Sequence, residues 1–214
     1  MMRVETRVLP ADDPQAVAEA VTLLRAGELV AFPTDTVYGI GAHAFIERAV
    51  ASLYTVKERV SEKAIPLLLS GAVDLPQVAQ PVPDLAWLLA EHFWPGALTL
   101  VVPKGPAVLE IVSPGPGVAV RVPDHVVAAA VIRRLGVPLA TTSANLSGAP
   151  SLSTAQEVWE QLGGRLRLIL DGGPCRGGIP STVLDLTVSP PRILRAGGIP
   201  AEALDRVLGG KVLC

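Results

Sequence analysis

LRLILDGGPCRGGIPSTVLDLTVSPPRILR, residues 166–195, is the stretch of sequence that decides the fold. It holds three short extended runs, Leu166–Leu170, Thr182–Leu186 and Ile193–Arg195, which are separated by turns rich in Gly and Pro. Before this stretch, helical and extended patterns alternate along the chain. Alternation followed by a cluster of strands predicts an α/β protein with a mixed, partly antiparallel sheet rather than a doubly wound parallel one.

Turn residues and periodicity predict the other elements. Asp13 as N-cap and Pro14 at the first helical position begin a helix that ends before Gly27. Ser153 followed by Gln156 predicts a capping box that opens a helix to Leu162. The remaining predicted helices are Ile46–Lys57, Pro83–Phe93, Val126–Leu135 and Ala201–Leu208, and the remaining strands are Leu29–Phe32, Ile65–Leu69, Ala97–Val102, Val118–Val122 and Leu139–Thr142.

Composition excludes several classes of protein. The 214 residues are 50% hydrophobic but only 4% aromatic, so the core is aliphatic and intrinsic disorder is excluded. The longest apolar run, Val126–Ile132, is far shorter than the ~20 residues that cross a bilayer. The first residues, MMRVETRVLPADD, include acidic residues and lack the apolar stretch that a secretion signal requires. We therefore expect a soluble, cytoplasmic protein that does not enter a membrane.

Metal ligands and cysteine pairs are scarce in the sequence. The only two cysteines, Cys175 and Cys214, form no CxxC pair, which excludes a zinc site or disulfide framework. His43, His92 and His125 have no carboxylates at ligand spacing. We expect no metal site built by the protein.

Five segments combine Gly or Pro with hydroxyls or cations next to predicted strands, where ligands bind in α/β folds. We interpret them as loops. Neither GxxxxGK[ST] nor a GxGxxG between strand and helix occurs, so a nucleotide would bind by another geometry. The segments are PTDTVYGIG (Pro33–Gly41), KERVSEK (Lys57–Lys63), VAVRVP (Val118–Pro123), TTSANLSGAPS (Thr141–Ser151) and GGIPSTVLDL (Gly177–Leu186), closed by LRAGG (Leu194–Gly198).

Cations in two of these segments suit an anionic ligand. Lys57, Arg59 and Lys63 have the charges that a triphosphate requires, although a solvated helix end with Glu58 and Glu62 explains them equally. Arg121 interrupts an apolar run on the face that we expect to be buried, so it needs an anion. That anion is either a ligand or a carboxylate of the protein.

Hydroxyl groups concentrate between Thr141 and Ser151, where they suit phosphate or carboxylate oxygens. Turn and capping roles explain Asn145 equally well. Ser143 has no base nearby in sequence and no GxSxG elbow, which disfavours covalent catalysis. We expect His125 to begin a helix, and the three tryptophans, Trp87, Trp94 and Trp159, to be core residues.

Taken in order, these segments resemble the YrdC-like domain of threonylcarbamoyl-AMP synthases. The motifs are PTDTVYGIG, Lys57-Glu58-Arg59, WPGALTLVVP, VAVRVP, TSANLSG, PSTVLDL and ILRAGG, from about Leu24 to Gly198. The resemblance implies a single YrdC-like catalytic domain over residues 1–208, with a twisted sheet, a positively lined groove and a short tail at 209–214. It implies the synthesis of threonylcarbamoyl-AMP and pyrophosphate from ATP, L-threonine and bicarbonate. The product would pass to a tRNA threonylcarbamoyl transferase for N6-threonylcarbamoyladenosine.

The resemblance also implies roles for residues at matching positions. Threonine would contact Thr36, Leu68, Arg121, Thr141 and Ser181. ATP would contact Lys57, Arg59, Lys63, Gly117, Ser143, Asn145, Ser151 and Arg195, and the catalytic residues would be Lys57 and Arg59. The sequence departs from the family pattern at Val60, at Ala64 and at Leu68, where some relatives have a His. Because the chain offers no carboxylate cage, we expect Mg²⁺ to be carried by the ATP phosphates.

Two other functions are compatible with the same residues. The hydroxyl-rich loops and clustered cations suit an RNA-binding module in tRNA or ribosome maturation, with weak RNA binding, although the net charge of −2 disfavours it as the main activity. A carbamoyl-adenylate former of the kind fused into hydrogenase-maturation proteins would occur in a longer, multidomain chain.

Overall fold

A computed structural model describes residues 4–58, 64–175 and 179–210. Its strands are β1 (Arg7–Pro10), β2 (Val30–Pro33), β3 (Tyr38–His43), β4 (Leu67–Leu68), β5 (Leu98–Pro103), β6 (Gly117–Arg121), β7 (Leu139–Ser143), β8 (Leu168–Asp171), β9 (Thr182–Asp185) and β10 (Arg192–Arg195). Its helices are α1 (Pro14–Arg25), α2 (Glu47–Lys57), α3 (Asp84–Phe93), α4 (Val126–Leu135), α5 (Ala155–Leu162) and α6 (Ala201–Leu208), with a short 3₁₀ helix, η1 (Ala72–Gln77).

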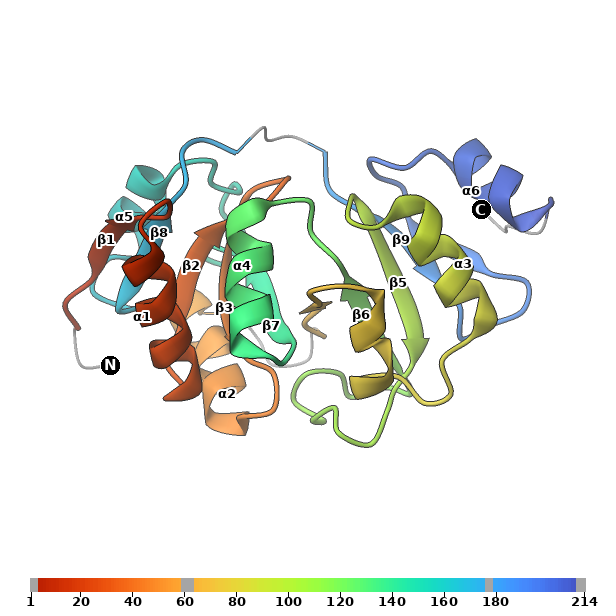
Figure 1. The fold of residues 1–214 in the computed structure, drawn as a ribbon, viewed down its shortest axis with the longest axis horizontal. Coiled ribbons are helices and arrows are strands. Elements are labelled where there is room, and N and C mark those ends of the chain that lie inside the picture. Colours follow the sequence, from red (N-terminus) through yellow and green to blue (C-terminus); the bar gives the residue numbers. More distant parts are fainter. Residues whose placement is uncertain (1–3, 59–63, 176–178, 211–214) are drawn as a thin grey trace.

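The strands form one mixed sheet in the order β1-β8-β2-β3-β7-β4-β6-β5-β9-β10 (Figure 1). The pairs β2–β3, β3–β7 and β5–β6 are antiparallel, whereas β1–β8, β4–β6 and β5–β9 are parallel. The predicted α/β class with a mixed, partly antiparallel sheet flanked by helices is therefore confirmed. β8 lies between β1 and β2, β7 lies between β3 and β4, and β9 lies beside β5, so residues far apart in sequence share one surface.

The two faces of the sheet have different coverings because side chains alternate along each strand. On β5, Leu98 and Leu100 point into the larger buried cluster, which also contains Leu53 of α2 and Leu89 of α3. Residues of α1 and α4 pack with Phe32 in a second cluster on the opposite face. These two helices cover only one end of that face. The rest of it carries a cavity lined by residues of β3, β7, β4, β6, β5, β9 and β10.

Helix α1 follows directly from its sequence. The side chain of Asp13 accepts a hydrogen bond from the backbone N–H of Gln15 at 2.8 Å, and Pro14 is the first helical residue. The inward side of α1 is apolar, and it packs on α4. The predicted N-cap and start of this helix are confirmed, and so are the exact bounds predicted for α4 and α6.

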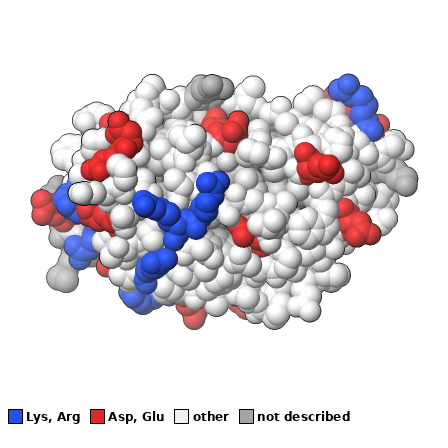
Figure 2. Space-filling view, viewed as in Figure 1, with Lys and Arg blue, Asp and Glu red and all other residues white. Residues whose placement is uncertain are grey.

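Basic side chains gather over α1 and α4 on the face shown in Figure 2. Arg25 and Arg134, in the last turns of these helices, each donate to a backbone carbonyl of the other helix at 3.1 Å. Arg25 reaches a free carbonyl at the C-terminus of α4, where a cation is favourable, and Arg134 reaches the first residue of α1, Pro14. These two contacts join the helix pair that covers one end of the sheet.

Three predictions about local structure are wrong. The segment Pro33–Gly41 is not one loop, because Tyr38–His43 is a buried strand whose alternate glycines hide its pattern. The capping box on α5 is formed by Thr154 and Glu157 instead of Ser153 and Gln156. The strand predicted at Ile65–Leu69 is reduced to β4, Leu67–Leu68.

The prediction that all three tryptophans are core residues is also wrong for two of them. Trp87 is 39% exposed and Trp159 is 47% exposed. The inward positions of their helices are taken by smaller residues such as Leu89 and Val158, which leaves the indoles on the outer side. Trp94 is partly buried against the core. No helix within the described residues has the length and apolar character needed to span a bilayer.

Candidate functional site

A cavity of about 790 Å³ lies over the part of the sheet face that α1 and α4 leave uncovered. Its walls come from segments between Thr34 and Arg195, so most of the sheet contributes to it. Eight of the residues assigned to ligand contact by the resemblance line it together: Thr36, Leu68, Arg121, Thr141, Ser143, Ser151, Ser181 and Arg195. A volume of this size is typical of small-molecule sites.

Two glycines of β3 lie where the strand is closely packed, and one of them, Gly39, lines the cavity. Gly39 lies beside Ser143 and Gly41 beside Thr141 in the antiparallel pairing with β7. A Cβ on Gly39 would come within 3.0 Å of Thr141 Cγ2, and one on Gly41 within 2.8 Å of Phe32 Cε1. Glycine at these positions therefore avoids close contacts with the Thr141 methyl group of β7 and with the Phe32 ring of β2.

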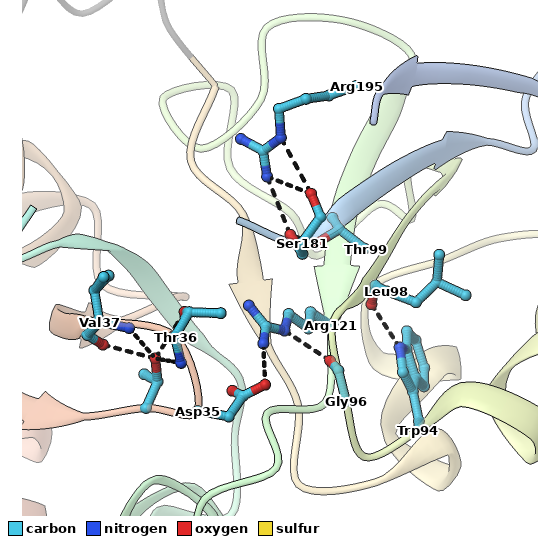
Figure 3. Close-up of polar contacts among 11 residues, drawn as sticks. Asp35, Thr36, Val37, Trp94, Gly96, Leu98, Thr99, Arg121, Ser181 and Arg195 are labelled. Atoms are coloured by element: carbon cyan, nitrogen blue, oxygen red, sulfur yellow. Dashed lines mark hydrogen bonds and ion pairs between the residues drawn. The ribbon is translucent and has the colours of Figure 1, made fainter. Parts of the chain in front are cut away.

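Arg121 stands at the end of β6 and is largely removed from water. Its Nε donates to the Gly96 carbonyl at 2.8 Å, and its Nη2 donates to Asp35 Oδ2 (Figure 3). Burial lowers the pKa of the guanidinium, and Asp35 opposes that shift. Of the two partners that the sequence left open for Arg121, a carboxylate of the protein is present. Nη1 has no hydrogen-bond partner among the described residues.

The segment before β5 holds Arg121 in place. Trp94 Nε1 donates to the Leu98 carbonyl at 2.7 Å, which fixes the turn (Figure 3). The backbone N–H of Gly96 donates to the Val122 carbonyl at 2.9 Å, while the Gly96 carbonyl accepts from Arg121. The guanidinium is therefore positioned by β6 itself and by the Trp94–Leu98 turn.

Asp35 lies at the tip of a tight turn between β2 and β3. Thr34 Oγ1 accepts from the backbone N–H of Thr36 at 3.2 Å and from that of Val37 at 3.3 Å, and it donates to the Val37 carbonyl at 2.7 Å. A hydroxyl in this arrangement fixes the turn. The turn directs the Asp35 carboxylate to Arg121 and leaves Thr36 on the cavity wall.

A second arginine faces the same cavity from the edge of the sheet. Arg195 donates to the Ser181 carbonyl through Nε at 3.1 Å and Nη2 at 2.8 Å, and to Ser181 Oγ at 3.1 Å. Ser181 Oγ and Thr99 Oγ1 are 2.8 Å apart (Figure 3). The pairing of β10 with β9 shifts register between Ile193 and Arg195, as at a β-bulge, which re-aims side chains. Arg195 also lowers the pKa of Arg121, so the two cations share one region.

Lys57 and Asn145 lie outside the cavity lining. Lys57 is 3% exposed, and its Nζ donates to the backbone carbonyls of Ser143 and Asn145 and to Asn145 Oδ1 at 3.3 Å. Asn145 Nδ2 donates to the carbonyls of Leu146 at 3.0 Å and Ala149 at 2.6 Å. Both residues therefore shape the turn that follows β7 and links Ser143 to Ser151, the two serines that line the cavity. Gly117 begins β6 at the end away from Arg121 and is not part of the lining.

Two of the predicted site residues are not described by the structure, and three residues at the site were not predicted. Arg59 and Lys63 lie outside the described residues. Thr34, Asp35 and Thr99 were not assigned from the sequence. A buried arginine needs an anion, and this signal could have found a carboxylate such as Asp35. Side chains alternate along β5, and this pattern could have placed Thr99 on the face that carries the cavity.

The arrangement suits a ligand with more than one anionic group. Two guanidinium groups and the hydroxyls of Thr141, Ser143 and Ser181 converge on one space. Buried or partly buried cations of like charge are stabilised when an anion lies between them.

Comparisons with known proteins agree with this geometry. The Sua5/YciO/YrdC family model, described as "Telomere recombination", matches residues 22–197. Threonylcarbamoyl-AMP synthase of Bacillus subtilis is 44% identical over 95% of this chain and 59% of its own length, and that of Pyrococcus abyssi 43% over 89% and 56%. The chain thus spans less than two thirds of these relatives. The crystal structure of P. abyssi Sua5 complexed with L-threonine superposes with a TM-score of 0.88 at 41% identity, covering 92% of this chain and 58% of that one.

Proposed function

The chain belongs to the Sua5/YciO/YrdC family, and from that premise we propose that it synthesises threonylcarbamoyl-AMP. The substrates are ATP, L-threonine and bicarbonate, and the products are threonylcarbamoyl-AMP, pyrophosphate and water. The observation that carries the proposal is the convergence of Arg121, Arg195 and the hydroxyl-bearing segments on one cavity. The solved P. abyssi relative with bound L-threonine supports threonine as the amino acid.

We assign the threonine subsite to the part of the cavity around Arg121. The substrate carboxylate pairs with the guanidinium, whose Nη1 is still available. Thr36, Thr141 and Ser181 supply hydroxyls, and Leu68 supplies an apolar wall for the substrate's methyl group. This assignment explains why a buried arginine is kept on an otherwise apolar strand.

We assign the nucleotide to the part lined by Ser143, Ser151 and Arg195. Arg195 and the predicted cations Lys57, Arg59 and Lys63 supply positive charge for the phosphates, and Mg²⁺ arrives on the ATP. Lys57 is buried against the turn after β7, so it contributes to nucleotide binding partly by holding that turn in place. Asn145 contributes in the same way, and Gly117 stays an expectation from the resemblance alone.

The proposed chemistry needs no covalent enzyme intermediate. The ammonium group of bound threonine releases a proton to solvent, and the resulting neutral amine attacks bicarbonate, which gives a carbamate and water. A carbamate oxygen then attacks the α-phosphorus of ATP, the bond to the β-phosphate oxygen breaks, and pyrophosphate leaves. The protein's contribution is to hold the reactants in line and to stabilise charge on the departing pyrophosphate, with Lys57 and Arg59 in the catalytic roles.

We further propose that residues 1–208 form the catalytic unit, since α6 ends at Leu208 and the family match lies within this range. The product is unstable outside an enzyme in the way that acyl adenylates are, so it would be passed to a tRNA threonylcarbamoyl transferase.

The decisive experiment is incubation with ATP, Mg²⁺, labelled bicarbonate and each amino acid in turn, followed by chromatography of the nucleotides. A labelled adenylate that appears only with threonine is the expected result. If labelled adenylate formed with another amino acid, the assignment of threonine as the substrate would be wrong. If no labelled adenylate formed with any amino acid, the proposed activity would be refuted. An Arg121→Gln variant in parallel ties the product to the cavity, because it should form little adenylate.

A further inference from the structure

The ion pair between Asp35 and Arg121 leaves one hydrogen-bond donor of Arg121 and one acceptor of Asp35 without a partner among the described residues. On Arg121, Nε donates to Gly96 and Nη2 to Asp35, while Nη1 has no partner among the described residues. On Asp35, Oδ2 accepts from Arg121, whereas Oδ1 is buried and has no hydrogen-bond partner within residues 4–58, 64–175 and 179–210. A buried carboxylate oxygen without a donor costs free energy. The free state of the site therefore lacks one donor beside Asp35 and one acceptor beside Arg121.

The pair is also electrically balanced. The side chains of Arg121 and Asp35 are 10% and 16% exposed, so water screens neither charge well. An anion that approaches Arg121 is attracted by the guanidinium but repelled by the carboxylate next to it. A ligand with a carboxylate alone therefore gains little, whereas a ligand with adjacent negative and positive groups satisfies both partners.

We propose that Asp35 recognises the α-amino group of the substrate, so that the Asp35–Arg121 pair selects a free amino acid as a zwitterion. Arg121 binds the carboxylate and Asp35 binds the ammonium group. This inference rests on the proposed function and deepens it, because it assigns specificity for the amino group to a residue paired with Arg121 beside the threonine subsite.

The contact requires a rotation of the Asp35 carboxylate, because Asp35 itself does not line the cavity and its Oδ1 is buried. The residues on either side of Asp35, Thr34 and Thr36, both line the cavity. Figure 3 shows the carboxylate between their turn and the guanidinium, with one oxygen directed to Arg121. The torsion that rotates a carboxylate has broad minima, so a small rotation presents an oxygen to a ligand nitrogen while the ion pair is kept.

The simplest competing explanation is that Asp35 only positions Arg121. The two explanations differ in what they predict for a ligand that lacks the amino group. If Asp35 only positions Arg121, its loss weakens every carboxylate ligand equally. If Asp35 binds the ammonium group, its loss weakens threonine alone.

The test compares binding of L-threonine and of 3-hydroxybutanoate, which is threonine without its amino group, by titration calorimetry. The Asp35→Asn variant keeps an oxygen that accepts from Arg121 and removes the negative charge. We expect this variant to bind threonine about 10- to 100-fold more weakly than the wild type does. Its affinity for 3-hydroxybutanoate should be unchanged or higher. Asp12→Asn, the same change at an exposed position, is the matched control and should leave both affinities unchanged.

Equal weakening of both ligands by Asp35→Asn would overturn the inference. Should that variant not fold, the wild-type protein still tests the inference. The inference requires the wild type to bind threonine much more tightly than 3-hydroxybutanoate. Equal wild-type affinities would refute the role of Asp35 while leaving the synthase activity intact. A wild-type protein that does not bind threonine at all would refute the proposed function itself.

Discussion

Lys57 donates to both oxygens of Asn145, the backbone carbonyl and, at 3.3 Å, Oδ1. This contact joins the end of α2 to the turn after β7, and the same ammonium group also reaches the Ser143 carbonyl. A residue that sequence reasoning assigned to a phosphate is thus an internal support of the turn that carries Ser143 to the cavity.

Lys57→Met should therefore lower both stability and activity. It keeps the volume of the side chain but removes the Lys57 donor from two carbonyls. The Ser143 carbonyl still accepts from the Asn145 N–H at 3.0 Å, whereas the Asn145 carbonyl loses the ammonium group, which costs about 1–3 kcal/mol. Denaturant unfolding gives the free energy of unfolding, and pyrophosphate release gives the activity. Lys104→Met is the matched control: Lys104 pairs with Glu110 away from the cavity, so pyrophosphate release should stay at the wild-type rate.

Arg59→Ala should lower pyrophosphate release more than threonine affinity, because the resemblance assigns Arg59 to the phosphates. The release assay and a threonine titration on the same preparation separate the two effects. Wild-type pyrophosphate release in both Lys57→Met and Arg59→Ala would show that the catalytic roles proposed for these residues are wrong.

Arg121→Lys should weaken threonine binding by roughly 10- to 100-fold and leave ATP binding close to that of the wild type. A lysine keeps the charge but has no planar fork, so it cannot contact Gly96, Asp35 and a carboxylate together. Titrations with each ligand measure the effect. Arg192→Lys, on the exposed edge strand β10, is the control and should change neither affinity. Equal losses for ATP and threonine would contradict a threonine-specific role.

Gly41→Ala should destabilise the fold by about 1–3 kcal/mol, because the added methyl would approach the buried ring of Phe32 to 2.8 Å. Gly115→Ala is the matched control, since a Cβ there meets no atom within 4 Å and its φ is not positive. The free energy of unfolding in denaturant measures both changes. A Gly41→Ala variant as stable as Gly115→Ala would mean that Phe32 moves aside at no cost.

His125→Asn should reduce the loss of stability on acidification. His125 caps α4 by accepting from the Val127 N–H through Nδ1, and burial lowers its pKa from the ordinary 6.5 against the opposing charges of Asp35 and Asp124. Because the folded pKa is the lower one, the unfolded chain binds more protons, so this contribution is complete above the unfolded pKa and is lost as pH falls below it.

The measurement is the free energy of unfolding of both proteins from about pH 7 to about pH 5. Asparagine is a good N-cap that does not titrate in this range, so α4 should stay capped. His43, whose pKa burial also lowers, is present in both proteins and cancels in the difference. Parallel pH profiles would show that His125 does not contribute.

Elements with strong local signals were predictable from the sequence. Asp13 with Pro14 marks the start of α1, and His125 and Gly136 bound α4, because capping and turn chemistry act within a few residues. β3 was not predictable in this way. Its glycines are there for contacts with Phe32 and Thr141, which only the assembled sheet creates.

The candidate site was predictable as a set of motifs but not as a set of contacts. Arg121 was recognisable because a charged residue interrupts an apolar strand, and that same rule required a partner. Its identity, Asp35, depends on a turn that lies 86 residues away in sequence. The burial of Lys57 had no local signal, since a lysine at a helix end is exposed in most proteins.

The strand order has a consequence for how the protein acquires its ligand. Ser181, Val183 and Arg195 of the cavity lining lie at or next to β9 and β10, the last strands of the chain, so the cavity is complete only after these strands have paired with β5 and with each other. We therefore expect chains in which β9 and β10 are not yet paired to lack a complete binding site. Occupancy by ligand reports on complete assembly of the protein, and protection by ligand during unfolding should be lost in a single step.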